Sequence, residues 1–236
     1  MSSNSGEKRA DFLRRSAKEI KNYKVTMRIL VSALIMLTIL TSVLYAVSAL
    51  YNNSGSFTVS VDKMEMTKYG LSLSEHRDMS YASSSLNAKI QEQITNIAGE
   101  SIPDNVDDVD GAHNGLHHIA YTFYLQNAGE VEVPCEYQVQ MSAISNGLDE
   151  AIRLRLYVDG VPTTYAKTKS SGEGPEPNTE PFYSSTVMAK GRIDRLNPGD
   201  VRKFTVVIWI EGNDPDCLDS LIGGEMKIDM AFAIIH

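Results

Sequence analysis

The sequence of 236 residues contains two cysteines, five histidines and one tryptophan. It has no His-Glu-x-x-His pair, so a zincin-type protease would lack both its ligands and its general base. Glycine and proline together number 24 and 42% of the residues are hydrophobic, which excludes a collagen and a disordered chain. The length fits one modest domain and an additional segment. No constellation of catalytic residues stands out, and we expect a protein that is not an enzyme.

Charged residues are absent from Ile29 to Tyr51, a run of 23 residues. A helix needs about 20 apolar residues to cross a bilayer, so residues 29–51 are predicted to form a transmembrane helix. The length of this run, and of the 28 residues before it, favours an uncleaved signal-anchor over a signal peptide. The alternative is cleavage after the small residues Val47-Ser48-Ala49.

Basic residues gather before this run. Residues 1–28 hold eight of the 22 Lys and Arg but three of the 30 Asp and Glu, which leaves 14 basic and 27 acidic residues in 29–236. The flank richer in Lys and Arg tends to stay in the cytoplasm. We therefore expect a single-pass protein of the plasma membrane, with a basic cytoplasmic tail (1–28) and an extracellular domain (52–236). The acidic balance of that domain argues against nucleic acid as a partner.

The extracellular part is predicted to be all-β, because apolar and polar residues alternate with the period of two that half-buried strands show. Six runs show this clearly: 57–61, 119–125, 135–143, 152–158, 204–210 and 226–234. Three weaker runs cover 71–73, 164–167 and 186–189. Alternation leaves one wet face per sheet, so the dry faces of two sheets must meet. We expect a two-sheet antiparallel sandwich in which Trp209 belongs to the core, covered by a helix or an end loop.

One short helix and two loops are expected to interrupt the strands. Four apolar residues fall at helical intervals after the serine run 83–85, namely Leu86, Ile90, Ile94 and Ile97. Residues 99–115 contain five acids and no Lys or Arg, and residues 168–185 contain three prolines. Both segments are predicted to be long exposed loops.

Two groups of carboxylates are the weak candidates for a metal site: Asp107, Asp108 and Asp110, and then Glu211, Asp214 and Asp216. An EF-hand register with Gly111 at position six puts His117 at position twelve, where calcium needs a carboxylate. For the first group we therefore favour a solvated, mobile loop over a looser calcium site. For the second we favour turns capped by side-chain hydrogen bonds over cation binding or acid/base catalysis. No cofactor is expected.

The histidines His113, His117 and His118 are clustered in the sequence. Gly111, Gly115 and the strand that begins near Ile119 favour a loop here, and neighbouring residues of a strand point to opposite faces. Metal binding by this cluster is therefore not favoured.

Both cysteines, Cys135 and Cys217, lie in the predicted extracellular domain. A bridge between them would stabilise the fold by about 4–5 kcal/mol in the chain-entropy model. The alternative is two buried thiols. In either case we expect the two residues to lie close together.

Three short motifs resemble the TasA and camelysin-like surface proteins of Gram-positive bacteria. They are Phe57-Thr58, Asn127-Ala128-Gly129 and Pro198-Gly199-Asp200, within residues 56–235. The resemblance implies a jelly-roll domain exported to the bacterial cell surface, which in some relatives polymerises into biofilm-matrix fibres. The end of the export signal departs from that family, because Leu50-Tyr51-Asn52-Asn53 stands where small residues run into an aromatic residue. No catalytic residues of the family have a match here.

Two functions follow as hypotheses. The first is a membrane-anchored, non-catalytic surface protein with a structural, adhesive or matrix-forming role, whose partners are the membrane, copies of itself or other surface proteins. The second is a surface hydrolase that uses the acidic loops. Carboxylates or histidines that converge in one cleft would favour the hydrolase, and an exposed sheet edge would favour the adhesive or fibre-forming protein.

Overall fold

The computed structural model describes residues 25–45, 57–88, 94–169, 171, 174 and 176–235. The chain divides into two compact units, Met1–Asn52 and Asn53–His236, and each is considered by itself. Most of the predicted cytoplasmic tail, the segment Val47-Ser48-Ala49 and the linker that follows it lie outside the described residues.

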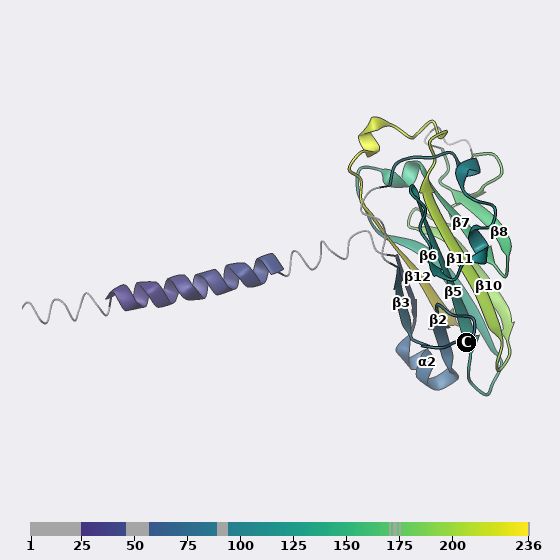
Figure 1. Ribbon diagram of the computed structural model, residues 1–236, viewed down its shortest axis with the longest axis horizontal. Coiled ribbons are helices and arrows are strands. Elements are labelled where there is room, and N and C mark those ends of the chain that lie inside the picture. The colour runs from purple at the N-terminus through teal and green to yellow at the C-terminus, as the bar shows by residue number, and fades with distance from the viewer. Residues whose placement is uncertain are drawn as a thin grey trace, which may run out of the picture. The chain divides into compact units, whose positions relative to one another are not determined.

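The first unit contains one long apolar helix, Val25–Tyr45 (Figure 1). With 21 residues, the helix is long and apolar enough to cross a membrane. It begins four residues before the predicted run 29–51, and the last six residues of that run lie outside the described chain. The hydroxyls of Ser32 and Thr38 donate to backbone carbonyls three residues earlier, which satisfies these groups without water.

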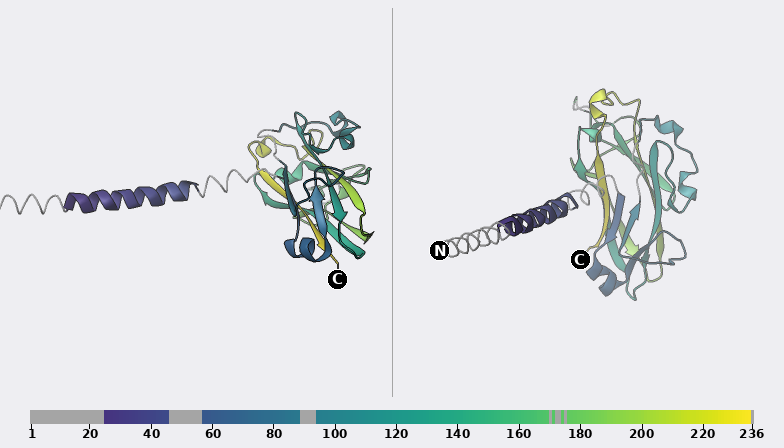
Figure 2. Two further views of the ribbon diagram at one scale, coloured as in Figure 1. Left: turned by 60° about the horizontal axis from the view of Figure 1, so that its bottom comes forward. Right: turned by 60° about the vertical axis from the view of Figure 1, so that its left-hand side comes forward.

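The second unit consists of two β-sheets (Figures 1 and 2). All nine predicted runs lie within strands or overlap them. The five-stranded sheet has the order β10 (Val187–Leu196), β6 (Val133–Ile144), β12 (Met226–Ile234), β1 (Phe57–Val61) and β3 (Ser85–Ala88). The seven-stranded sheet has the order β2 (Leu71–Ser74), β5 (His118–Asn127), β11 (Val201–Ile210), β7 (Ile152–Val158), β8 (Val161–Ala166) and β9 (Glu180–Pro181), with β4 (Gly111–Ala112) also paired to β5.

Both sheets are mixed, which corrects the prediction of purely antiparallel sheets. Strand β1 runs parallel to β12, with Phe57 opposite Ile228, and β8 runs parallel to β9. The strands β1 and β12 come from the two ends of the domain sequence. No short hairpin joins them, so nothing forces the antiparallel direction that a hairpin imposes.

The inner faces of the two sheets share one hydrophobic core. Phe204 on β11 packs against Phe232 on β12 with ring centroids 5.0 Å apart, and it stacks on Phe123 of β5 at 5.6 Å. Val206 and Ile208 are buried in the same core, as their alternation predicts. The apolar side chains of each sheet are therefore removed from water by the opposite sheet.

A second, smaller cluster covers the outer face of the seven-stranded sheet. Ile102 and Val106 pack there against Val207 and Trp209, so β11 is buried on both faces. The predicted exposed loop 99–115 is therefore wrong in part: it contains the short 3-10 helices η1 (Gly99–Ser101) and η2 (Val106–Asp108) as well as β4, and it serves as a cover. Its burial of Trp209 agrees with the expectation that an end loop covers this side chain.

The predicted helix over Leu86–Ile97 is not present in the described part of this segment. Residues 85–88 form β3, which pairs with β1, and Ile97 bridges to Glu211. Residues 89–93 lie outside the described chain. The backbone N–H and C=O groups of β3 are paired with those of a strand that is distant in the sequence. Local helical spacing does not reveal such a partner.

Within the described part of the domain, the α-helix lies elsewhere, at α2 (Lys63–Tyr69). Asp62 caps its first turn by accepting from the Met64 N–H, and Gly70 ends it in the left-handed conformation. No residue of α2 is buried, so the helix lacks the apolar stripe that makes helices visible in a sequence.

Both cysteines are free thiols, and the expectation that they lie close together is wrong. The antiparallel strands β6 and β12 define two ends of the sheet. At the first end, Cys135 lies opposite Ile234, and at the second end, Ile144 lies opposite Met226. These two ends are separated by about 30 Å of extended strand. Cys217 belongs to the second end, because its thiol accepts a hydrogen bond from Asn96, next to the bridge that joins Ile97 to β11.

Candidate functional site

The first carboxylate group fastens the covering loop to the sheet below. Asp107 forms an ion pair with Lys203 at 3.1 Å and accepts a hydrogen bond from the Thr205 hydroxyl. Asp110 accepts a hydrogen bond from the Tyr124 hydroxyl. Burial, followed by this contact, raises the pKa of Tyr124 to about 12. Asp108 lies exposed in η2.

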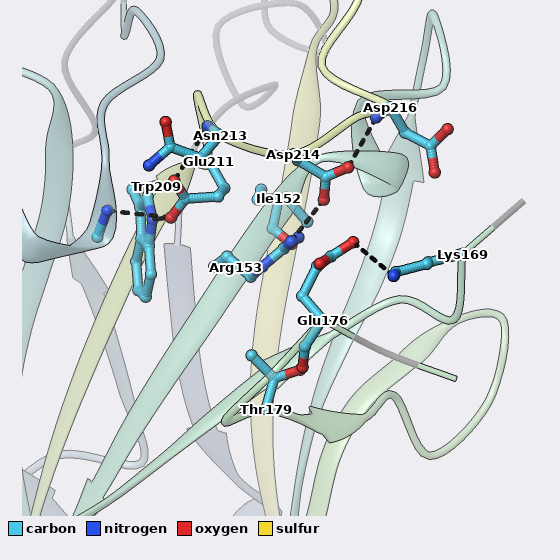
Figure 3. A network of polar contacts seen from close by, with 11 residues as sticks. Ile152, Arg153, Lys169, Glu176, Thr179, Trp209, Glu211, Asn213, Asp214 and Asp216 are labelled. Carbon is cyan, nitrogen blue, oxygen red and sulfur yellow. Dashed lines mark hydrogen bonds and ion pairs between the residues drawn. The ribbon is translucent and has the colours of Figure 1, made fainter. Parts of the chain in front are cut away.

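The second group forms a network of turns beyond β11 (Figure 3). One oxygen of Glu211 accepts from the Trp209 indole N–H at 2.9 Å and from the Gly99 N–H at 3.0 Å, and the other accepts from the Asn213 N–H. Asp214 is buried, pairs with Arg153 and accepts from the Asp216 N–H at 2.7 Å. These contacts agree with the expectation of turns capped by side-chain hydrogen bonds.

The predicted metal candidates do not converge in the described residues. No group of three His, Cys, Asp or Glu side chains is arranged there as metal ligands. The absence of a cofactor remains a prediction.

The three histidines point to separate partners. The ring nitrogens of His113 lie 2.8 Å from the carbonyl oxygens of Gly111 and Val106, and Nδ1 of His117 lies 2.8 Å from the Thr95 hydroxyl. His118 is buried, and desolvation, followed by the charges of His113 and His117, lowers its pKa. The three rings therefore lie within electrostatic range of one another, but His113 and His117 are engaged by different partners.

A groove on the outer face of the seven-stranded sheet is a further candidate site, which the sequence did not predict. It consists of two adjoining hollows of about 450 and 870 Å³, which share Asp104, Arg155, Thr164, Asn178 and Thr179. We call it the β7 groove, because Arg153, Arg155 and Tyr157 of β7 line it along the strand. Hollows of this size are in the range of small-molecule and short-polymer sites.

Two segments line the sides of the β7 groove. Residues 99–104 of the covering loop contribute Glu100 and Asp104, and residues 176–180 contribute Asn178, Thr179 and Glu180. The second segment is fixed by a turn in which the Thr179 hydroxyl donates to the Glu176 carbonyl at 2.6 Å (Figure 3).

The floor of the groove is organised around Arg155. Its guanidinium carbon lies 5.1 Å from the centre of the Trp209 ring, and its Nε donates to the Thr164 hydroxyl at 3.2 Å. Strand pairing produces this arrangement, because Arg155 lies opposite Thr164 on β8 and opposite Val207, two residues before Trp209, on β11. The contact with the Trp209 ring and the hydrogen bond from Nε hold the planar guanidinium of Arg155 in a defined orientation.

The sequence contained part of this signal. Because Ile152, Leu154 and Leu156 alternate toward the core, Arg153 and Arg155 must face outward on the same strand. The two loops that enclose these arginines are brought there by tertiary packing, for which the local pattern offers no sign.

No family model matches this chain, and no curated protein matches it. Among solved structures, the crystal structure of a β-glucosidase from Kluyveromyces marxianus in complex with glucose covers 78% of this chain at 11% sequence identity, with a TM-score of 0.24. The match spans 18% of that chain. A similarity at this level carries no argument about fold or activity.

Proposed function

We propose that this protein is a non-catalytic adhesive module of the cell surface, anchored in the plasma membrane by its N-terminal helix with the β-rich domain outside. The apolar helix Val25–Tyr45 and the excess of Lys and Arg before residue 29 support the anchor and its orientation. The jelly-roll-like sandwich and the relationship to TasA-like proteins belong to the same proposal.

The observation that carries the proposal is the state of the two carboxylates at one end of the β7 groove, Glu211 and Asp214. Glu211 and Asp214 are engaged by the indole, backbone N–H groups and Arg153. A general acid or base needs a proton-transfer position open to substrate, whereas these two groups hold the end of the groove in place. The engagement of Glu211 and Asp214 therefore supports recognition of a ligand more than hydrolysis, whereas Glu100, Asp104 and Glu180 line the sides of the groove as exposed side chains.

The edges of the five-stranded sheet argue against polymerisation into fibres by strand addition. Strand β10 is the long edge of the five-stranded sheet, and it exposes four charged side chains: Lys190, Arg192, Asp194 and Arg195. Charges on an edge strand oppose strand addition from another chain. The edge strand at the other side, β3, has four residues.

Two measurements test this function. Protease treatment of intact cells should remove the C-terminal domain and leave the first 28 residues protected. Cells that display the full chain should aggregate or adhere to immobilised fragments of their own envelope more than cells that produce residues 1–52 alone. A domain that is protected from protease, or adhesion equal to that of the truncated chain, contradicts the proposal.

A further inference from the structure

We infer that the β7 groove binds a neutral oligosaccharide, an inference that rests on the proposed adhesive function and names its ligand. Arg155 on the floor of the groove has no ion pair among the described residues, whereas Arg153, two residues earlier on the same strand, is neutralised by Asp214. The Nε of Arg155 donates to the Thr164 hydroxyl, and Arg155 lines the groove, so its guanidinium has further N–H groups that a ligand there can accept from.

The sides of the groove have the opposite character. Glu100, Asp104 and Glu180 are exposed side chains that line it, and none forms an ion pair within the described part of the chain. Carboxylates accept hydrogen bonds and donate none when ionised. Asn178 adds an amide that both donates and accepts.

A ligand that satisfies both surfaces must accept hydrogen bonds over the floor and donate them to the sides. A sugar hydroxyl does both, and it carries no charge. A polyanion would be repelled by the three carboxylates at the sides, and a polycation would face the Arg155 guanidinium on the floor. A ligand without charge avoids both repulsions. The groove follows an extended strand and has two adjoining hollows, which suits a chain of several sugar units better than a single one.

The test uses the full chain in a detergent without a sugar headgroup. An array should carry neutral oligosaccharides, uronic-acid oligomers, amino-sugar oligomers, oligolysine and oligoglutamate, and the Kd of the strongest neutral ligand is then measured by calorimetry. We expect binding to neutral oligosaccharides. Arg155→Gln and Asp104→Asn should each weaken it at least tenfold, and Arg155→Lys should not restore it, because an ammonium lacks the planar fork.

Arg195→Gln is the matched control, because this arginine side chain is 79% exposed, is absent from the lining of the β7 groove and should leave the Kd unchanged. Thermal melting of each variant separates lost binding from lost folding. Charged oligomers that bind with the same dependence on Arg155 and Asp104 would overturn the sugar but not the adhesive function. Neutral sugars whose binding ignores both substitutions would overturn the groove as the site. An array without any bound ligand would overturn the inference, while the protease and adhesion measurements decide the proposed function separately.

Discussion

Tyr137 on β6 lies across Gly191 on β10, and its ring fills the space that a side chain at position 191 would occupy. The two residues are direct partners in the antiparallel pair, and a Cβ on Gly191 would lie 2.2 Å from the Tyr137 hydroxyl oxygen. The ring also packs against Phe204, whose centroid is 5.4 Å away. The tyrosine therefore has little freedom to give way.

Gly191→Ala should lower the free energy of unfolding by about 1–3 kcal/mol, which is the usual cost of overpacking. Chemical denaturation followed by circular dichroism measures the change. Gly174→Ala is the control, because no atom of the described residues beyond its chain neighbours lies within 4 Å of a Cβ at that position. Equal effects of the two substitutions would show that the Tyr137 ring does not press on position 191.

Ile208 offers a test of the core between the sheets. Its side chain is 2% exposed on the inner face of β11, which is a central strand. Ile208→Ala should cost about 2–5 kcal/mol, because it removes buried apolar atoms and leaves a cavity. Ile222→Ala, at a side chain that is 76% exposed, should change stability by less than about 0.5 kcal/mol. A loss below about 1 kcal/mol at Ile208 is incompatible with its place in the core.

The positions of the strands could be predicted from the sequence, because alternation reports which face of a strand is buried and is a local property. The order of the strands could not. Phe57 finds its partner at Ile228, and no short-range pattern contains that pairing. The expectation that Cys135 and Cys217 lie close together is wrong for the same reason, because the local pattern does not show which strand ends meet.

The candidate site was less predictable than the fold. The run of acids after a strand predicts that Glu211 and Asp214 cap turns by side-chain hydrogen bonds. It does not predict their partners Gly99 and Arg153, which lie in distant segments of the sequence. The β7 groove depends on how two irregular loops, residues 99–104 and 176–180, pack against the sheet. Irregular backbone has no periodicity from which such contacts can be derived.

The buried pair between Arg153 and Asp214 should contribute strongly to folding. The two side chains are 3% and 5% exposed, so removal of one charge leaves the other buried without a partner. Asp214→Asn should therefore cost about 3–5 kcal/mol. Asp194→Asn, which breaks an ion pair whose aspartate is 82% exposed, should have little effect. Similar denaturation midpoints for the two variants would contradict a structural role for Asp214.

The two thiols should differ in reactivity, since the thiolate is the form that attacks a labelling reagent. Burial, followed by the nearby Glu65, raises the pKa of Cys135 to about 12. Cys135 therefore remains protonated and covered in the folded protein, whereas Cys217 is half-buried in a loop. Ellman's reagent at pH 8, without reductant, should label one thiol rapidly and the second only after denaturant is added. Cys217→Ser should abolish the rapid phase.

Cys135 should also make the fold sensitive to alkaline pH. A thiol has a pKa of about 8.5 in an unfolded chain, so between about pH 8.5 and 12 the unfolded state releases a proton that the folded state keeps. The contribution of this group to stability is complete below that window and is lost as the pH rises through it. The free energy of unfolding should fall less steeply above pH 9 in Cys135→Ala than in the natural chain, although the variant starts from lower stability because it leaves a cavity. Parallel pH profiles for the two proteins, or rapid labelling of both thiols at pH 8, would contradict the buried and protonated state of Cys135.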